Sequence, residues 1–114
     1  MTISEELALS FDCLSDVTRI KIVQLLREND DPLTVHGIAS VLGLRDGTVS
    51  HHLRILLIGR LVQRIPSGKY AFYQLNLSEL TRLGEVVTEF GRLKTTLDLD
   101  AISISTPIPN KETT

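Results

Sequence analysis

The residues with the clearest chemical potential lie between positions 45 and 69. This segment has one acidic residue and five basic ones, so its formal charge is +4, whereas residues 1–44 carry −4 and residues 70–114 carry −2. Clustered Lys and Arg side chains bind the phosphates of nucleic acid. The segment therefore predicts a nucleic-acid-binding surface, although the net charge of the whole chain is −2. Its basic residues are Arg45, Arg54, Arg60, Arg64 and Lys69.

Two short helices joined by a tight turn are expected to position these side chains. Thr34 is a good N-cap, and apolar residues follow it at helical spacing as far as Leu42. Gly43 ends this helix, because glycine adopts the positive φ of a sharp turn. The next predicted helix runs from Arg45 to Leu56, and the pattern is that of a helix-turn-helix. Its predicted core residues are Val49, Leu53 and Leu56.

The opposite face of the Arg45–Leu56 helix carries short or hydrogen-bonding side chains. Such a face can enter the major groove of DNA, which is ~12 Å wide, and contact base edges. We predict base contacts for Ser50, His51 and Arg54, and a phosphate contact for Thr48 near the helix N-terminus. The predicted DNA-binding residues are Arg45, Asp46, Gly47, Thr48, Ser50, His51, Arg54, Arg64, Ser67 and Lys69.

Two further helices and a hairpin complete the predicted domain. Helical spacing predicts a first helix over residues 3–14 and a second from Val17 to about Glu28, capped by Asp16 and central in the core. The runs Leu61–Ile65 and Tyr70–Leu75 predict a β-hairpin with its turn at residues 66–69. Three residues near the tip would contact the DNA backbone or minor groove, namely Arg64, Ser67 and Lys69.

A last helix is predicted to begin after Asn76, which has the spacing of a capping box to Glu79, and to continue for roughly five turns to Leu97. Its apolar stripe is longer than so small a core can cover, so we expect the same helix of a second copy to cover it. The predicted dimer interface consists of Ile3, Leu7, Phe11, Leu83, Val87, Phe90, Leu93 and Leu97.

The predicted fold class is mainly α with a small β-hairpin (α+β), in the order α-α-α-α-β-β-α of a winged helix-turn-helix. The 114 residues allow one domain, over residues 1–97, and the aperiodic residues 98–114 predict a disordered tail. The acidic N-terminus and the lack of a long apolar run predict a cytoplasmic protein with no membrane partner. The single cysteine, Cys13, agrees with a reducing compartment.

Four segments, LSDVTRIKIVQLL, IASVLGLRDGTVSHHLRIL, GRLV and SGKYAFYQL, together resemble the ArsR/SmtB family of repressors. The resemblance covers about residues 11–76. It implies a dimer of winged helices joined through the first and last helices, which binds a palindromic operator and is released by an inducer. Many members of the family sense metal ions.

The chain departs from the family at its metal sites. Thr34 and His36 occupy the positions where one type of family sensor has a Cys-x-Cys pair. Another type binds metal through Asp and His residues of the last helix, but residues 77–97 contain no histidine. The single cysteine cannot form the pair that persulfide sensors need. We therefore predict no metal site and no cofactor, and the sequence does not specify the inducer. His36 is expected to be an ordinary surface residue, although Asp30 and Asp31 leave a metal open as the alternative.

Other departures concern the predicted DNA-binding helix. Arg45 replaces the usual serine cap, so Asp46 could cap the helix one residue later. Leu57 and Ile58 stand where charged residues are usual, and Gly59-Arg60 replaces alanine followed by glycine. Two adjacent histidines are expected to point in different directions, His51 toward DNA and His52 inward as a hydrogen-bonded structural residue. Cys13 is expected to be a small buried hydrophobe, with a redox switch as the alternative.

These features predict a homodimeric, sequence-specific repressor whose partner is a double-stranded DNA operator. The alternative is a winged helix that binds another protein independently of DNA, which the negative net charge, Asp46 and the apolar Leu57-Ile58 pair would favour. No enzyme is expected, because the sequence shows no nucleophile with a base at a recognisable spacing and no phosphate-binding loop.

Overall fold

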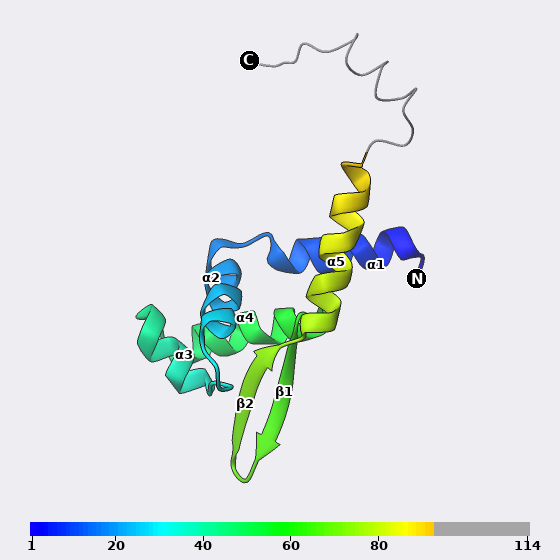
Figure 1. Ribbon diagram of the computed structural model, residues 1–114. Helices are drawn as coiled ribbons and strands as arrows, with labels where there is room; N and C mark the ends of the chain where they lie inside the picture. Colours follow the sequence, from blue (N-terminus) through cyan, green and yellow to red (C-terminus); the bar gives the residue numbers. More distant parts are fainter. Residues whose placement is uncertain (93–114) are drawn as a thin grey trace, which may run out of the picture. The chain divides into compact units, whose positions relative to one another are not determined.

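The computed structural model describes residues 1–92 (Figure 1), in which five helices and one antiparallel hairpin confirm the predicted fold class. Residues 1–83 form one compact unit, and a second begins at Gly84 within the last helix. Leu93, Leu97 and the predicted tail lie outside the described residues. The elements are α1 (Ile3–Leu14), α2 (Val17–Glu28), α3 (Val35–Leu42), α4 (Asp46–Ile58), β1 (Val62–Ser67), β2 (Tyr70–Leu75) and α5 (Leu77–Phe90).

Side-chain caps determine where the first three helices begin. Thr2 and Glu5 form a complete capping box at α1, and the Thr34 hydroxyl accepts a hydrogen bond from the Gly37 N–H at the start of α3. At α2, the Asp16 carboxylate accepts from the Arg19 N–H at 3.1 Å. The caps predicted at Asp16 and Thr34 are confirmed, because each side chain satisfies a backbone donor that has no partner within the helix.

The Asp16 cap gives the stability of the protein a testable pH dependence. The Arg19 N–H bond lowers the pKa of Asp16 below its ordinary value. A carboxyl whose pKa is lower in the folded state stabilises the fold above its unfolded pKa, and this contribution is lost as the pH falls through the folded pKa.

Asparagine also caps helices but does not titrate. The melting temperature of Asp16→Asn should therefore lie below that of the wild type above about pH 5, and the difference should shrink toward pH 3. Thermal melts followed by circular dichroism would measure this, and a pH-independent difference would contradict it.

The core of the first unit lies where α2, α3, α4 and the base of the hairpin meet. The largest fully buried side chains include Ile22, Ile38, Leu53, Leu56 and Leu61. α2 was predicted to be central in the core, and it contributes to the core along one side only: Ile22 and Leu26 are buried, whereas Ile20 is 43% exposed. A domain this small covers α2 on one side only, so its other apolar residues remain at the surface.

The hairpin is longer and its turn tighter than predicted. The strands pair from Val62 opposite Leu75 to Ser67 opposite Tyr70, so the turn contains only residues 68 and 69. Gly68 has a φ of 60°, which a two-residue hairpin turn requires and glycine permits. The loop before α3 also joins β2, since Leu33 and Tyr73 exchange backbone hydrogen bonds at 3.0 and 2.7 Å.

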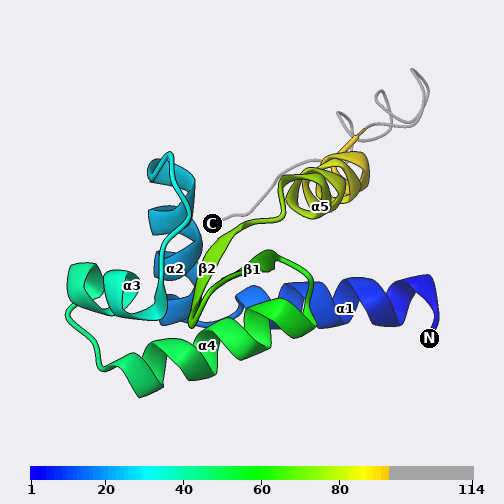
Figure 2. The same ribbon diagram turned by 90° about the horizontal axis from the view of Figure 1, so that it is seen from below.

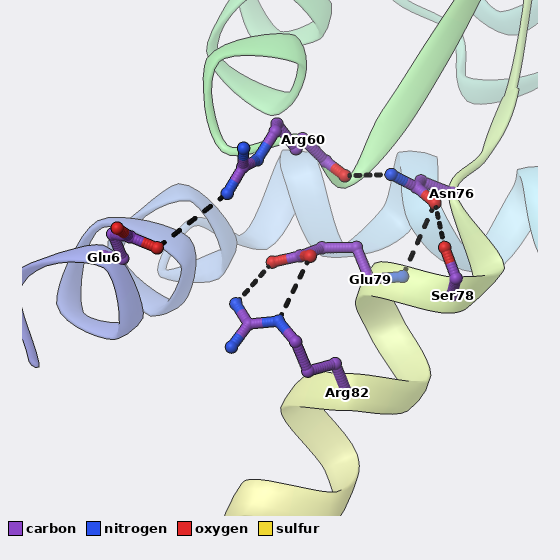
Figure 3. Close-up of polar contacts among 6 residues, drawn as sticks. All are labelled: Glu6, Arg60, Asn76, Ser78, Glu79 and Arg82. Atoms are coloured by element: carbon purple, nitrogen blue, oxygen red, sulfur yellow. Dashed lines mark hydrogen bonds and ion pairs between the residues drawn. The ribbon is translucent and has the colours of Figure 1, made fainter. Parts of the chain in front are cut away.

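The start of α5 only partly matches the predicted capping box. Asn76 Oδ1 accepts from the Glu79 N–H at 3.4 Å. The Glu79 carboxylate does not return to the cap but pairs with Arg82 at 2.7 Å (Figure 3), and this hydrogen bond lowers the pKa of Glu79. Leu83 was predicted at the dimer interface, but it is only 4% exposed and packs in the core of its own protomer. An apolar stripe along α5 does not distinguish a residue covered within the chain from one that a partner would cover.

The second unit comprises, within the described residues, the end of α5 and two residues after it. Val87 and Phe90 are exposed there, Phe90 to 74%. The Glu89 carboxylate pairs with the Arg92 guanidinium at 3.0 Å.

Candidate nucleic-acid interface

The helix predicted from Arg45 to Leu56 instead spans Asp46 to Ile58. Arg45 is the N-cap residue in extended conformation, with φ −80° and ψ 148°, and its side chain makes no capping hydrogen bond. Asp46 does not cap the helix either. Its carboxylate Oδ1 lies 3.2 Å from Nδ1 of His36, which fixes an acidic group in the first turn of α4. A negative charge at this end of a helix is favourable because of the helix dipole.

The turn between α3 and α4 has the predicted glycine geometry. Gly43 is left-handed with a φ of 68°, and the Leu44 N–H returns to the Ala39 carbonyl at 2.9 Å. Ala39 and Val49 are both buried where the two helices cross. Figure 2 shows the result, with α4 along one edge of the unit, α3 at its N-terminal end and α1 beside its C-terminal half. This arrangement leaves one long side of α4 open.

The open side of α4 carries the side chains that the sequence placed there. Val49, Leu53 and Leu56 are buried, as predicted from their spacing. Ser50 is half-buried, and the other predicted DNA-binding residues of this segment are exposed, namely Arg45, Asp46, Gly47, Thr48, His51 and Arg54. The exposed groups of α4 and its N-cap residue therefore include two guanidinium groups, a histidine, a hydroxyl and a carboxylate.

The hairpin adds a second exposed element. Arg64, Ser67 and Lys69 are exposed, and the Lys69 ammonium lies 5.9 Å from the centre of the Tyr70 ring. Lys69, Tyr70, His36 and Asp46 line an open hollow of about 420 Å³, so the wing borders the beginning of α4. Tyr70 and His36 were not among the predicted DNA-binding residues. For Tyr70, the position of an aromatic residue next to a predicted turn could have indicated such a role.

The inner side of α4 is attached to α1 and α2 by hydrogen bonds around His52. The Arg19 guanidinium donates to His52 Nδ1 at 3.2 Å and to the Cys13 carbonyl at 2.7 Å. The Asp16 carboxylate lies 3.8 Å from the same imidazole nitrogen. His52 is thus the hydrogen-bonded structural residue that was predicted, while the adjacent His51 is exposed.

Cys13 is a buried hydrophobe, as predicted, and is 2% exposed. Burial raises the pKa of its thiol, which disfavours the reactive thiolate.

A Cβ atom built on Gly59 would lie 2.7 Å from Cys13 Sγ. The glycine that ends α4 therefore allows α1 to approach closely, which explains why Gly59 replaces the usual alanine.

Metal ligands do not gather anywhere in residues 1–92: no three His, Cys, Asp or Glu side chains there are grouped as a metal site. His36 lies next to Asp46, and neither Asp30 nor Asp31 forms an ion pair with it. Of the helices in the described part of the chain, none is long and apolar enough to cross a membrane.

A helix-turn-helix followed by a two-stranded wing defines the class of the fold as a winged helix-turn-helix. Residues 16–64 match the family model described as bacterial regulatory protein, arsR family. The chain is 34% identical over 70 residues to the transcriptional repressor SdpR of Bacillus subtilis. These residues are 61% of this chain and 76% of SdpR. The chain belongs to the ArsR family.

Other known proteins are similar to this chain in sequence or in fold. A homolog of the cadmium resistance transcriptional regulatory protein CadC from Staphylococcus aureus is 32% identical over 80 residues, which are 70% of this chain and 65% of that protein. The fold resembles an ArsR-like transcriptional regulator from Rhodococcus sp. RHA1, with a TM-score of 0.75 and 23% identity over 92% of this chain and 97% of that one. It also resembles a homodimeric winged helix-turn-helix DNA-binding domain from Mycobacterium bovis, with a TM-score of 0.65 and 23% identity over 81% and 85% of the two chains.

Proposed function

We propose that the protein is a homodimeric transcriptional repressor that binds a palindromic operator through α4 and the wing. The observation that carries this proposal is the open face of α4, where His51 and Arg54 are exposed on a helix whose other side is anchored in the core, with Arg45 exposed at the N-cap. The names of its relatives, a transcriptional repressor and a transcriptional regulatory protein, support the proposal.

The dimensions of this face suit a DNA groove. From Asp46 to Arg54 the helix rises about 12 Å, at 1.5 Å per residue, which is comparable to the width of the major groove. Ser50, His51 and Arg54 would contact base edges, because their side chains hydrogen bond and lie beyond the first turn of α4. Thr48, with the free N–H groups of that first turn, would contact a phosphate.

The wing would contact the DNA beside the groove that α4 occupies. Arg64, Ser67 and Lys69 are exposed and reach beyond the core of the unit on a two-stranded ribbon. Their charges and hydroxyl suit the sugar-phosphate backbone or the minor groove, where they would increase affinity without determining sequence. Asp46 would contribute selectivity, because a carboxylate accepts from the cytosine amino group and is repelled by phosphate.

A second copy of the chain would cover the apolar surfaces that this one exposes. Ile3 and Phe11 are exposed on α1, and Val87 and Phe90 are exposed on α5. Exposed apolar side chains of this size in two helices are typical of an interface. The Mycobacterium bovis domain with a similar fold is a homodimer, which supports the proposal of a dimer here. Two copies would place two α4 helices on half-sites about 34–36 Å apart.

We also infer that release from DNA does not use the soft-metal chemistry of a thiolate pair. The chain has one cysteine, and it is buried in the core. The protein would act in the cytoplasm as a DNA-binding switch without catalytic activity, and its trigger must be of another kind.

Fluorescence anisotropy with purified protein tests the proposal. The labelled DNA is the region upstream of the protein's own gene, and the control is a shuffled duplex of equal length. We expect binding by two protomers per site, with an affinity for the upstream region that falls steeply as salt rises. Equal affinity for both duplexes, or no binding at low salt, would contradict the proposal.

A further inference from the structure

Three residues that the DNA-binding face leaves without a role come together in the structure. Ile58, Gly59 and Arg60 depart from the family pattern, and all three line one pocket of about 270 Å³. The other wall is the side of α1 that carries Glu6, Leu9 and Ser10. The pocket thus lies between α1 and the C-terminal end of α4, within the first compact unit, and we call it the α1–α4 pocket.

The charged wall of the α1–α4 pocket consists of Arg60 and Glu6. Their nearest atoms, Nη2 and Oε1, are 4.0 Å apart, and both side chains are partly exposed, so each retains capacity to bind another group (Figure 3). The backbone of Arg60 is held firmly, because its carbonyl accepts from the Asn76 amide at 2.9 Å and its N–H donates to the Leu57 carbonyl at 3.0 Å.

Arg60 is held in a conformation that ordinarily favours glycine. Its φ is 60°, and it is the only non-glycine residue with a positive φ in the described chain. Arg60 directly follows Gly59, the C-cap residue of α4, and the Leu61 N–H donates to the Leu56 carbonyl at 3.0 Å. These bonds form a Schellman helix end, whose residue after the cap is left-handed, so the end of α4 accounts for the positive φ and places Arg60 beside the pocket.

Ser10 provides an independent sign that the pocket takes a polar ligand. Ser10 lines the pocket and is only 5% exposed. Within residues 1–83, its hydroxyl takes part in no hydrogen bond. A buried hydroxyl without a partner is unfavourable, and native structures rarely leave one unexplained. A ligand atom in the pocket would supply the missing partner.

We propose that the α1–α4 pocket binds a small zwitterion of the α-amino-acid class with a short apolar side chain, and that its binding changes the affinity of α4 for DNA. The carboxylate of the ligand would pair with Arg60 and Ser10, and its ammonium with Glu6. Leu9 and Ile58 would contact the apolar part. The volume is just below the 300–1,000 Å³ typical of drug-sized ligands, which suits a molecule of this size.

The position of the pocket explains how a ligand would act on DNA binding. One wall is the end of α4, the helix whose other end carries the proposed DNA contacts. The opposite wall is α1, whose neighbouring face carries the exposed Ile3 and Phe11 of the proposed dimer interface. A ligand that contacts both walls would favour one arrangement of α1 against α4. If DNA binds that arrangement with a different affinity, the pocket and the DNA-binding face are coupled. This coupling rests on the proposed repressor function.

The experiment uses the full chain and the twenty free amino acids at millimolar concentration, with saturation-transfer NMR and melting temperature as readouts. Aliphatic carboxylic acids and primary amines of matched size are the single-charge comparisons. We expect one or more apolar amino acids to bind at least tenfold more tightly than either comparison. Arg60→Gln, Glu6→Gln and Ser10→Ala should each weaken binding at least fivefold. Arg92→Gln breaks a similar exposed ion pair, with Glu89, and should leave binding unchanged.

Two results would overturn the pocket assignment: no amino acid binds, or binding is equal in the wild type and in all three pocket variants. DNA affinity is then measured with and without the bound amino acid, and a change of at least fivefold is expected. A bound amino acid that changes DNA affinity less than twofold would refute the coupling. Absence of DNA binding both with and without the bound amino acid would refute the repressor function, while the NMR result would still decide the pocket.

Discussion

The Arg54→Ala variant is expected to bind operator DNA about ten- to a hundredfold more weakly than the wild type. Arg54 is exposed on the open face of α4, and no carboxylate in the described residues forms an ion pair with it. A guanidinium that contacts a base edge with two hydrogen bonds contributes ~1–3 kcal/mol, and about 1.4 kcal/mol corresponds to a tenfold change in affinity. Anisotropy titrations at fixed salt would measure the loss.

The matched control is Arg27→Ala, which removes the same charge from the exposed last turn of α2. This position lies in neither α4 nor the wing, so its effect should be within about threefold, a level set by long-range charge alone. The specificity of Arg54→Ala should also fall, because its affinity for the shuffled duplex changes less than its affinity for the operator. Equal losses for the two variants would mean that Arg54 contributes charge and no base contact.

The Gly59→Ala variant is expected to lower the free energy of unfolding by about 1–3 kcal/mol, the usual cost of overpacking. Its new Cβ would lie 2.7 Å from Sγ and 2.9 Å from Cβ of Cys13, and Cys13 has no room to move because it is buried in the core. For a domain of this size, each kcal/mol lowers the melting temperature by about 4–8 °C. Thermal melts by circular dichroism would measure the shift.

Gly47→Ala is the control within the same helix. No atom lies within 4 Å of a Cβ at Gly47, and alanine is the better helix former, so this variant should be as stable as the wild type or more so. In a Cys13→Ala background the cost of Gly59→Ala should fall but not vanish, since only the sulfur is removed. If Gly59→Ala were as stable as Gly47→Ala, the close approach of α1 to the end of α4 would be wrong.

Local sequence rules predicted most of the secondary structure. The starts of α2 and α3 follow from Asp16 and Thr34, whose caps involve residues only three positions away. The turn between α3 and α4 follows from Gly43, and the buried side of α4 follows from the spacing of Val49, Leu53 and Leu56. These features depend on neighbours along the chain, so a single sequence contains the information for them.

Contacts between distant segments could not be predicted in this way. The Leu33–Tyr73 bridge, the Cys13–Gly59 packing and the Glu6–Arg60 pair join residues that are 40 or more positions apart. Nothing in the local pattern around Gly59 indicates which helix approaches it. The same limitation explains Leu83, because periodicity shows that a residue is covered but not which chain covers it.

The candidate DNA-binding face was predicted more completely than its surroundings. Helical periodicity separated the outer residues of α4 from its core residues, and the structure exposes the outer residues except Ser50, which is half-buried. The start of the helix was displaced by one residue, because Arg45 does not occupy a helical conformation. The His36–Asp46 pair requires the packing of α3 against α4, so it became visible only in the structure. Contact of these residues with DNA stays a prediction.

An NMR titration of the isotope-labelled protein with an operator duplex of about 30 base pairs, enough for two half-sites and flanks, tests the central claim most directly. The account predicts that the largest amide shifts at saturation fall in Asp46–Arg54 of α4 and in the wing from Arg64 to Tyr70, with little change over the exposed side of α2. Shifts concentrated outside α4 and the wing would contradict it.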